Sequence, residues 1–345
     1  MYISSQNFTT SLRQSVLQTE NSLATAQTEV GSGVYADLGL QLGGQTSTAI
    51  SLSQQSASLS ALTSSNATAS ARLSSTDSAL TSIAAAAQSL SNTLVSNAAG
   101  SSITSSTVTE AQAGLQSLIG TLNTSVAGQY IFGGTNTQTV PMSDIATTTT
   151  AVNDALTSDL AGIDSDTTQI TGDQMQAYLS STTSQFGDLF QSSGSWSTLS
   201  SASATALTSE ISTSQTATTS VSANQTAFQN IAQAYSMLAG LGTTNLSADA
   251  SQAVISTATQ LLNAGIASLT TVQANVGNAQ SSITGANGQM SAQQTILTNN
   301  VNDLEQVDTY TLSTKVTALQ TQLQDAYSLT NQLKSLSLVN YLTAG

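Results

Sequence analysis

Apolar side chains recur at alternating steps of three and four residues near both ends of the chain. The positions are Leu12, Val16, Thr19, Leu23, Ala26 and Val30 near the start, and Leu312, Val316, Leu319, Leu323, Ala326, Thr330 and Leu333 near the end. These steps place the side chains on one face of a helix, which is typical of a coiled coil. The two ends are therefore predicted to form helices that pair with each other. Isolated helices this polar are marginal in water, so they are expected to order when neighbouring copies pack on them.

A longer run of the same kind lies in the first third of the chain. Its positions are Leu59, Leu62, Asn66, Ala69, Leu73, Thr76, Leu80, Ile83, Ala87, Leu90 and Leu94. Five heptads on one face predict a helix of about 50 residues, about 75 Å long. The helix should end near residues 97–100.

A third run is predicted to begin near Ser247. Ile266, Leu269, Val276, Ile283, Met290, Leu297, Val301 and Leu304 keep the heptad phase, and the alternate core position is assigned to Gln273, Gln280, Asn287 and Gln294. Amides at such positions either specify the register at a cost in stability or simply face water. The spacing leaves both interpretations open.

Several shorter features have local interpretations. Thr107 and Glu110 have the spacing of a capping box, which predicts a helix that starts there and ends at Gly128. The Gly-rich residues 31–44 are predicted to be a hinge loop. The helical pattern is expected to return at Leu207 and Ile211 and to continue through Tyr235.

The middle of the chain differs from its flanks. Residues 136–203 hold the single proline, seven aspartates and the aromatic residues Phe186, Phe190 and Trp196. The predicted fold is mainly α: an elongated rod of long antiparallel helices, a terminal coiled coil formed by both chain ends, and a small mixed α/β or β-containing tip domain. The expected boundaries are 1–34 with 304–345 for the terminal coiled coil, 35–128 with 205–303 for the rod, and 129–204 for the tip.

Composition excludes several classes of function. The 345 residues carry 6 % charged side chains and a formal net charge of −14, with four cations. A nucleic-acid binder or a protein of anionic membrane surfaces needs a basic patch, so neither partner is expected. The chain has no His and no Cys, which removes the usual zinc sites, thiol nucleophiles and Ser-His-Asp triads. No enzyme activity, cofactor or cleaved signal peptide is expected, nor is an apolar stretch long enough for membrane insertion.

One acidic pair has a spacing that could hold a divalent cation. Asp164-x-Asp166 lacks the glycine and closing glutamate of a calcium loop, so a solvated acidic loop is the favoured interpretation. No metal site is predicted. Lys315 and Lys334 are assigned to a solvated helix face.

The stretch AGQYIFGGTNT, residues 127–137, places two large aromatic side chains beside a glycine pair. Gly133 and Gly134 let the chain reverse with little steric cost. Tyr130 and Phe132 are predicted to pack back on the rod or the tip and to fix the angle between them. The alternative is that they only cap the end of the helix bundle.

Three segments carry a resemblance to a known family. AGQYIFGGTNTQTVP, EVGSGVYADLGLQLGG and DAYSLTNQLKSLSLVNYL, residues 127–141, 29–44 and 325–342, resemble the flagellin superfamily and, within it, the junction proteins between hook and filament. With the heptads, the resemblance covers residues 1–141 and 205–345. It implies an extracellular structural part of the bacterial flagellum that leaves the cell through the type III export channel without a cleaved signal.

The resemblance also implies the partners and the interaction residues. The expected partners are further copies in a ring, the preceding hook-associated protein, flagellin and an export chaperone. The assembly seam is assigned to Leu12, Val16, Leu23, Val30, Leu312, Val316, Leu319, Leu323 and Leu333, and the rod-to-tip turn to Tyr130, Phe132, Gly133 and Gly134. A filament subunit, flagellin itself, is the close rival. A surface module that binds a ligand or cation through the acidic middle segment, and a secreted enzyme on the same scaffold, are the more distant alternatives.

Overall fold

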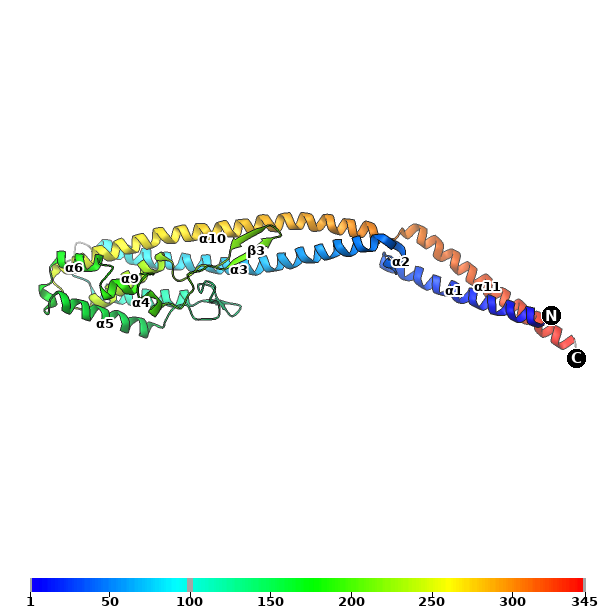
Figure 1. The fold of residues 1–345 in the computed structure, drawn as a ribbon, viewed down its shortest axis with the longest axis horizontal. Coiled ribbons are helices and arrows are strands. Elements are labelled where there is room, and N and C mark those ends of the chain that lie inside the picture. Colours follow the sequence, from blue (N-terminus) through cyan, green and yellow to red (C-terminus); the bar gives the residue numbers. More distant parts are fainter. Residues whose placement is uncertain (1, 98–101, 344–345) are drawn as a thin grey trace. The chain divides into compact units, whose positions relative to one another are not determined.

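The computed structural model describes residues 2–97 and 102–343 (Figure 1). It describes the side chains of these residues except 2–6, 8, 97 and 333–343. The chain divides into two compact units. Unit 1 comprises residues 1–60 and 291–345, and unit 2 comprises residues 61–290. Long helices dominate, and the β structure of the described residues is confined to two small antiparallel sheets. The predicted class, mainly α with a small β-containing part, is confirmed.

Unit 1 is built on the two chain ends. Helix α1 (Tyr2–Ser32) and helix α11 (Thr309–Thr343) lie side by side and run antiparallel, which confirms the predicted pairing of the ends (Figure 1). Next to them, residues 33–35 and 305–307 form a short antiparallel bridge. Tyr35 N donates to Glu305 O at 3.0 Å, and Val307 N donates to Gly33 O at 3.0 Å. The bridge ties together the two points where the chain leaves the helix pair.

The Gly-rich segment is more ordered than the sequence predicted. Helix α2 (Leu38–Leu42) and the 3-10 turn η1 (Gly43–Gln45) occupy much of residues 31–44, so the expected hinge loop is wrong in part. Asp37 caps α2, because its carboxylate accepts from Leu40 N at 2.9 Å. Gly33 and Gly43, with φ of 76° and 52°, provide the left-handed conformations at the two bends.

Two long helices supply residues to both units. Helix α3 (Thr46–Asn97, 52 residues) matches the predicted length of about 50 residues, and helix α10 (Ala248–Glu305) has 58 residues. Every predicted core position of the long run in α3 is buried except Leu62, which is half-buried. The heptad interpretation of α3 is confirmed.

At the alternate core positions of α10, the buried residues lie one position before those that the heptad spacing assigns. Between the confirmed core residues Leu269, Val276, Ile283 and Met290, the buried alternate positions are Ala279 and Ala286, with Gly265 in the same phase. The structure decides between the two interpretations that the spacing leaves open: Gln273, Gln280, Asn287 and Gln294 are half-buried at the edge of the core rather than inside it. After Val276 and Ile283, the next core residue follows three positions later instead of four, because small side chains allow close approach. A Cβ on Gly265 would lie 2.5 Å from Ile231 Cγ1.

Helix α4 (Ser105–Leu122) begins and ends earlier than predicted. Its N-cap is Thr104, whose hydroxyl accepts from Thr107 N at 3.2 Å, so the capping box at 107–110 is wrong. The helix stops at Leu122 because a small hairpin follows, formed by β1 (Ser125–Val126) and β2 (Gln129–Tyr130). Ala127 and Gly128 have φ of 51° and 77°, which is the pairing a type I′ turn needs. Gly128 therefore makes a hairpin turn rather than a helix end.

The segment after the hairpin folds into short helices. These are α5 (Ile145–Ile163), η2 (Thr167–Gln169), α6 (Gly172–Ser180), α7 (Gln185–Leu189) and α8 (Trp196–Leu199). Phe186 and Phe190 lie with ring centroids 5.2 Å apart, and Phe190 and Trp196 lie 6.1 Å apart. All three rings are buried, so the aromatic residues of this segment form part of one core.

A second hairpin replaces the helix predicted at Leu207 and Ile211. Strands β3 (Thr208–Ser212) and β4 (Gln215–Thr218) pair antiparallel, with an irregular register between Glu210 and Ser212. The β-branched residues Thr208, Ile211, Thr216 and Thr218 favour strands here, which the four-residue spacing concealed. Helix α9 (Thr226–Leu241) follows and is buried on nearly all sides, so it lies inside the core of unit 2.

Candidate assembly interface

The seam between α1 and α11 is only partly covered. Its described apolar side chains are half-buried in most cases (Leu12, Val16, Leu23, Val316, Leu319 and Leu323), whereas Leu312 is buried and Val30 is exposed. The side chain of Leu333 lies outside the described residues. The fully buried cluster consists of Ala26, Val307 and Leu312. A seam of this kind buries little apolar surface, so it holds the two helices together only weakly.

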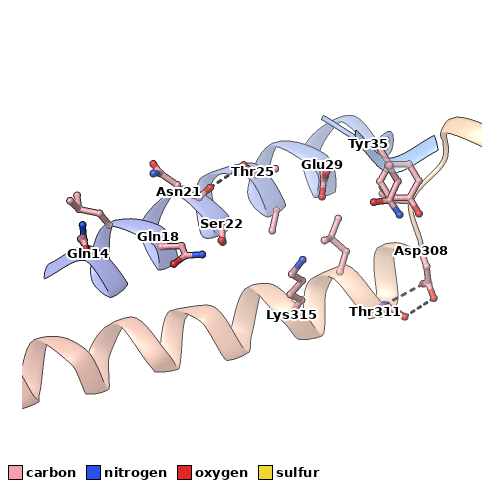
Figure 2. A pocket seen from close by; sticks show the side chains of 15 residues that line it. Gln14, Gln18, Asn21, Ser22, Thr25, Glu29, Tyr35, Asp308, Thr311 and Lys315 are labelled. Carbon is pink, nitrogen blue, oxygen red and sulfur yellow. Dashed lines mark hydrogen bonds between the residues drawn. The ribbon is translucent and has the colours of Figure 1, made fainter. Parts of the chain in front are cut away.

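A groove of about 690 Å³ runs between the two helices (Figure 2). Polar side chains line most of it: Gln14, Gln18, Asn21, Ser22, Thr25 and Glu29 from α1, and Asp308, Thr311 and Lys315 from α11 and the residue before it. Leu17, which is 56 % exposed, contributes an apolar side chain to the same groove. Ala26, Val307 and Leu312 line it as well, so the groove offers both polar and apolar contacts, as an amphipathic helix would need.

Asp308 organises one end of the groove. Thr311 Oγ1 donates to Asp308 Oδ2 at 2.6 Å, and Thr311 N donates to Asp308 Oδ1 at 3.2 Å (Figure 2). The hydroxyl of Thr311, followed by the backbone N–H groups, holds the pKa of Asp308 below its ordinary value. Asp308 is thus the N-cap of α11 and fixes where that helix begins.

The two helices also meet through a tyrosine. Tyr327 OH donates to Glu20 Oε1 across the pair. This bond to a carboxylate, together with partial desolvation, raises the pKa of Tyr327. Because the contact lies on the surface, it links the two helices but does not bury the seam side chains.

Large apolar side chains that remain exposed concentrate in unit 1. Nine of the eleven among the described residues belong to it, namely Leu17, Val30, Val34, Leu40, Ile50, Ile296, Tyr310, Tyr327 and Leu329. Tyr310 is 83 % exposed. The exposed large apolar side chains of the described residues are therefore concentrated in the unit that contains the paired chain ends.

The predicted rod-to-tip turn is tightly packed inside unit 2. Phe132 is fully buried, and its ring meets that of Phe228 edge to face with centroids 5.6 Å apart. A Cβ on Gly133 would lie 2.5 Å from Asn136 O, and one on Gly134, which has φ of 61°, would lie 2.5 Å from Ser203 O. Tyr130 is half-buried at the end of β2.

Backbone hydrogen bonds join this turn to the far end of the inserted segment. Thr135 N donates to Thr205 O at 3.0 Å, and Ser203 N donates to Gly133 O at 3.0 Å. Ala223 N donates to Phe132 O at 2.8 Å. The turn therefore brings together the places where the chain enters and leaves the segment, which only glycines allow at such close approach.

Three polar groups in unit 2 were missed by the sequence argument or were given no role by it. Asn66 is fully buried and donates from Nδ2 to Ile211 O at 2.8 Å and to Asn287 Oδ1 at 2.7 Å. Asn224 Oδ1 accepts from Trp196 Nε1 at 2.8 Å and from Ser200 Oγ at 2.7 Å. The guanidinium of Arg72 is buried as well. The position of Asn66 in a run of apolar core positions was the only signal in the sequence.

The acidic pair has a local structural role. Asp164 Oδ1 accepts from Asp166 N at 2.9 Å, and Asp166 Oδ1 accepts from Thr168 N at 3.0 Å. Hydrogen bonds from Thr168 lower the pKa of Asp166. Within residues 2–97 and 102–343, no group of three metal-ligating side chains was found, and no described helix is long and apolar enough to cross a membrane.

Comparison with known families gives two matches at the two ends. The family model for the bacterial flagellin N-terminal helical region matches residues 3–137, and that for the bacterial flagellin C-terminal helical region matches residues 259–342. The chain belongs to the bacterial flagellin superfamily. The two matched regions include almost all of α1 and α11, the helices that pair in unit 1. As a flagellin-family protein, the chain is a structural component of the bacterial flagellum.

A solved structure shares the fold of this flagellin-family chain. It is described as a "putative flagellar hook-associated protein from Vibrio parahaemolyticus", is 13 % identical, and has a TM-score of 0.51 over 76 % of this chain and 97 % of its own. No curated protein sequence matches. Flagellin-family proteins self-assemble and associate with other flagellar proteins, and their place is the extracellular flagellum.

Proposed function

We propose that this protein is an adaptor between the flagellar hook and the filament, and that it assembles through the helix pair of unit 1. The observation that carries the assembly role is the concentration of exposed large apolar side chains in unit 1. A neighbouring subunit would cover these side chains and occupy the polar groove beside them. The predicted seam residues from Leu12 to Leu333 are the proposed interaction residues.

The choice of the junction over the filament rests on two features. The turn at residues 130–134 resembles that of junction proteins, and its packing around Phe132 and Gly134 supports a rigid connection at this point. In addition, the solved structure with the same fold carries the description of a hook-associated protein. Flagellin remains the second candidate, because both kinds of protein use the same terminal helices.

The proposed partners follow from this role. They are further copies of the chain in a ring, the preceding hook-associated protein on one side, flagellin on the other, and an export chaperone before secretion. We further propose a non-enzymatic protein that is exported without a cleaved signal, with the terminal, rod and tip segments divided at 34, 128, 204 and 303 as the sequence predicts.

A polymerisation assay tests the proposal. The purified chain is incubated with filament fragments as seeds, and the products are examined by electron microscopy. The adaptor role predicts monomers that bind to filament or hook ends without further growth. Long filaments that grow from this protein alone would identify a filament subunit and overturn the junction role.

A further inference from the structure

Arg72 is an unusual residue in its surroundings. It lies on α3 in unit 2, where its side chain is only 8 % exposed. The other three cations of the chain, Arg13, Lys315 and Lys334, belong to unit 1, so every other charged side chain of unit 2 is acidic. A buried cation is normally paired with a carboxylate, because an uncompensated buried charge destabilises a fold.

The described residues supply Arg72 with only one side-chain partner, and it is neutral. Arg72 Nη1 donates to Gln129 Oε1 at 3.3 Å, which is long for a hydrogen bond from a charged donor. Nε and Nη2 are buried and have no hydrogen-bond partner among the described residues. Burial lowers the pKa of the guanidinium, and no carboxylate acts to raise it. The charge is therefore held in place without compensation.

The geometry of Nε and Nη2 indicates which chemical group would bind them. Nε–H and Nη2–H point in parallel from one edge of the guanidinium plane, and this edge matches the two oxygens of a carboxylate. A carbonyl or hydroxyl oxygen would satisfy only one of the two donors. We propose that Arg72, with Gln129 beside it, forms a carboxylate-binding site of unit 2.

The element that carries Gln129 makes such binding accessible. Gln129 belongs to the hairpin of β1 and β2, whose strands have two residues each. Strands this short add little pairing of their own, so a shift of the hairpin at Gln129 would open Nε and Nη2 to a carboxylate. A carboxylate on Nε and Nη2 would add a charged acceptor to the neutral one, Gln129 Oε1, that Nη1 already has.

The carboxylate has two sources. It is either a small carboxylate in solution or an acidic side chain of a second copy of this chain, which presents many because the net charge is −14. Only the second source rests on the proposed assembly. In that case Arg72 would join two copies that otherwise repel each other through their acidic surfaces.

The first experiment measures binding to the full-length monomer. The thermal unfolding midpoint is followed by circular dichroism in sodium acetate and in sodium chloride at equal ionic strength, for the wild type, Arg72→Met and Arg72→Lys. Arg13→Met is the matched control, since it removes an exposed cation of unit 1. The site predicts a saturable rise of the midpoint with acetate in the wild type and Arg13→Met, none in Arg72→Met, and at least a tenfold higher half-saturating concentration in Arg72→Lys.

The second experiment compares assembly of the wild type and Arg72→Met in the seeded assay. If Arg72→Met no longer binds ends while its thermal unfolding midpoint in chloride is unchanged or raised, the variant is folded. The loss of end binding then assigns the carboxylate to a neighbouring subunit. Unchanged end binding with an acetate effect specific to Arg72 assigns it to a small molecule. Equal acetate effects in the wild type and Arg72→Met, or no acetate effect together with normal assembly of Arg72→Met, would overturn the site. If the wild type itself does not bind ends, the proposed function fails, and the acetate series still decides the site.

Discussion

The two units are made of the same kinds of residue yet differ in how completely they bury them. In unit 2, the core positions of α3 from Leu73 to Leu94 are all buried, and α9 is enclosed on nearly all sides. In unit 1, the same heptad spacing leaves most seam side chains half-buried and nine large apolar side chains exposed. A heptad pattern therefore sets which face of a helix is apolar. The number of elements packed on that face decides whether its side chains are buried.

The sharpest test of this difference is a charge placed in the seam of unit 1. Leu319→Asp or Leu23→Asp should abolish assembly by disturbing the pairing of α1 with α11, while unit 2, which contains neither helix, stays folded. Circular dichroism of the monomer and a seeded polymerisation assay measure the two effects, and a motility assay reports the result in cells. A full filament in either variant would contradict the assembly role of the seam.

The same kind of change in unit 2 should act on folding instead. Phe132→Ala removes a fully buried ring from the contact with Phe228 and should lower the free energy of unfolding by about 3–5 kcal/mol. Chemical denaturation of the monomer measures the loss. Phe132→Leu is the matched control, since it keeps much of the apolar volume and should cost less. Equal stability of wild type and Phe132→Ala would show that the turn is not part of the core.

A smaller effect is expected at the start of α11. Asp308→Ala removes the N-cap and should lower the midpoint of unit 1 slightly at pH 7. The pKa of Asp308 is lowered in the folded state, so the stabilisation is present above the ordinary aspartate pKa of about 4 and is lost as the pH falls below it. Thermal unfolding of both proteins between pH 7 and pH 3 checks this, because the two midpoints should converge at the acidic end. Asp308→Asn, which retains a capping oxygen, should lie between them.

The smallest effect is expected at Tyr235 in unit 2. Its hydroxyl is buried and has no hydrogen-bond partner in the part of the chain that the structure describes. Burial, with a contribution from Glu110, raises the pKa of Tyr235 to about 12. A raised pKa gives stability that is complete below the ordinary tyrosine pKa of about 10 and is lost as the pH rises toward 12. Tyr235→Phe should therefore unfold with an equal or slightly higher midpoint at pH 7 and lose less stability between pH 10 and pH 12. A clear loss of stability at pH 7 would show that the hydroxyl has a partner.

Much of the helical architecture could be predicted because local spacing carries it. The run from Leu59 to Leu94 gave the length and the buried face of α3, and the seams at the two ends gave the pairing of α1 with α11. The errors fall where the decision depends on distant residues. One error is the helix predicted at Leu207 and Ile211, where the structure has a hairpin. The place of the amides from Gln273 onward was left open, because a core position and a water-facing position fit the spacing equally well. Close approach at Ala279, Ala286 and Gly265 settled that choice.

The candidate interface was predictable to a similar extent. The seam residues and the turn at 130–134 could be named because heptads and glycine pairs are local signals. The groove beside the seam and the exposed Tyr310 could not be predicted, since exposure depends on which elements are absent from a face. The buried Arg72 was equally hidden, because nothing near it in the sequence indicates that Gln129 approaches from a hairpin.

The sequence by itself determined the long helices, the pairing of the chain ends and the poverty of catalytic side chains, because periodicity and composition are properties of the chain alone. The tertiary structure decided which heptad faces are sealed, that residues 208–218 form a hairpin instead of a helix, and that a cation lies uncompensated in unit 2. These outcomes depend on contacts between residues far apart in the chain, whose free energies outweigh local preference.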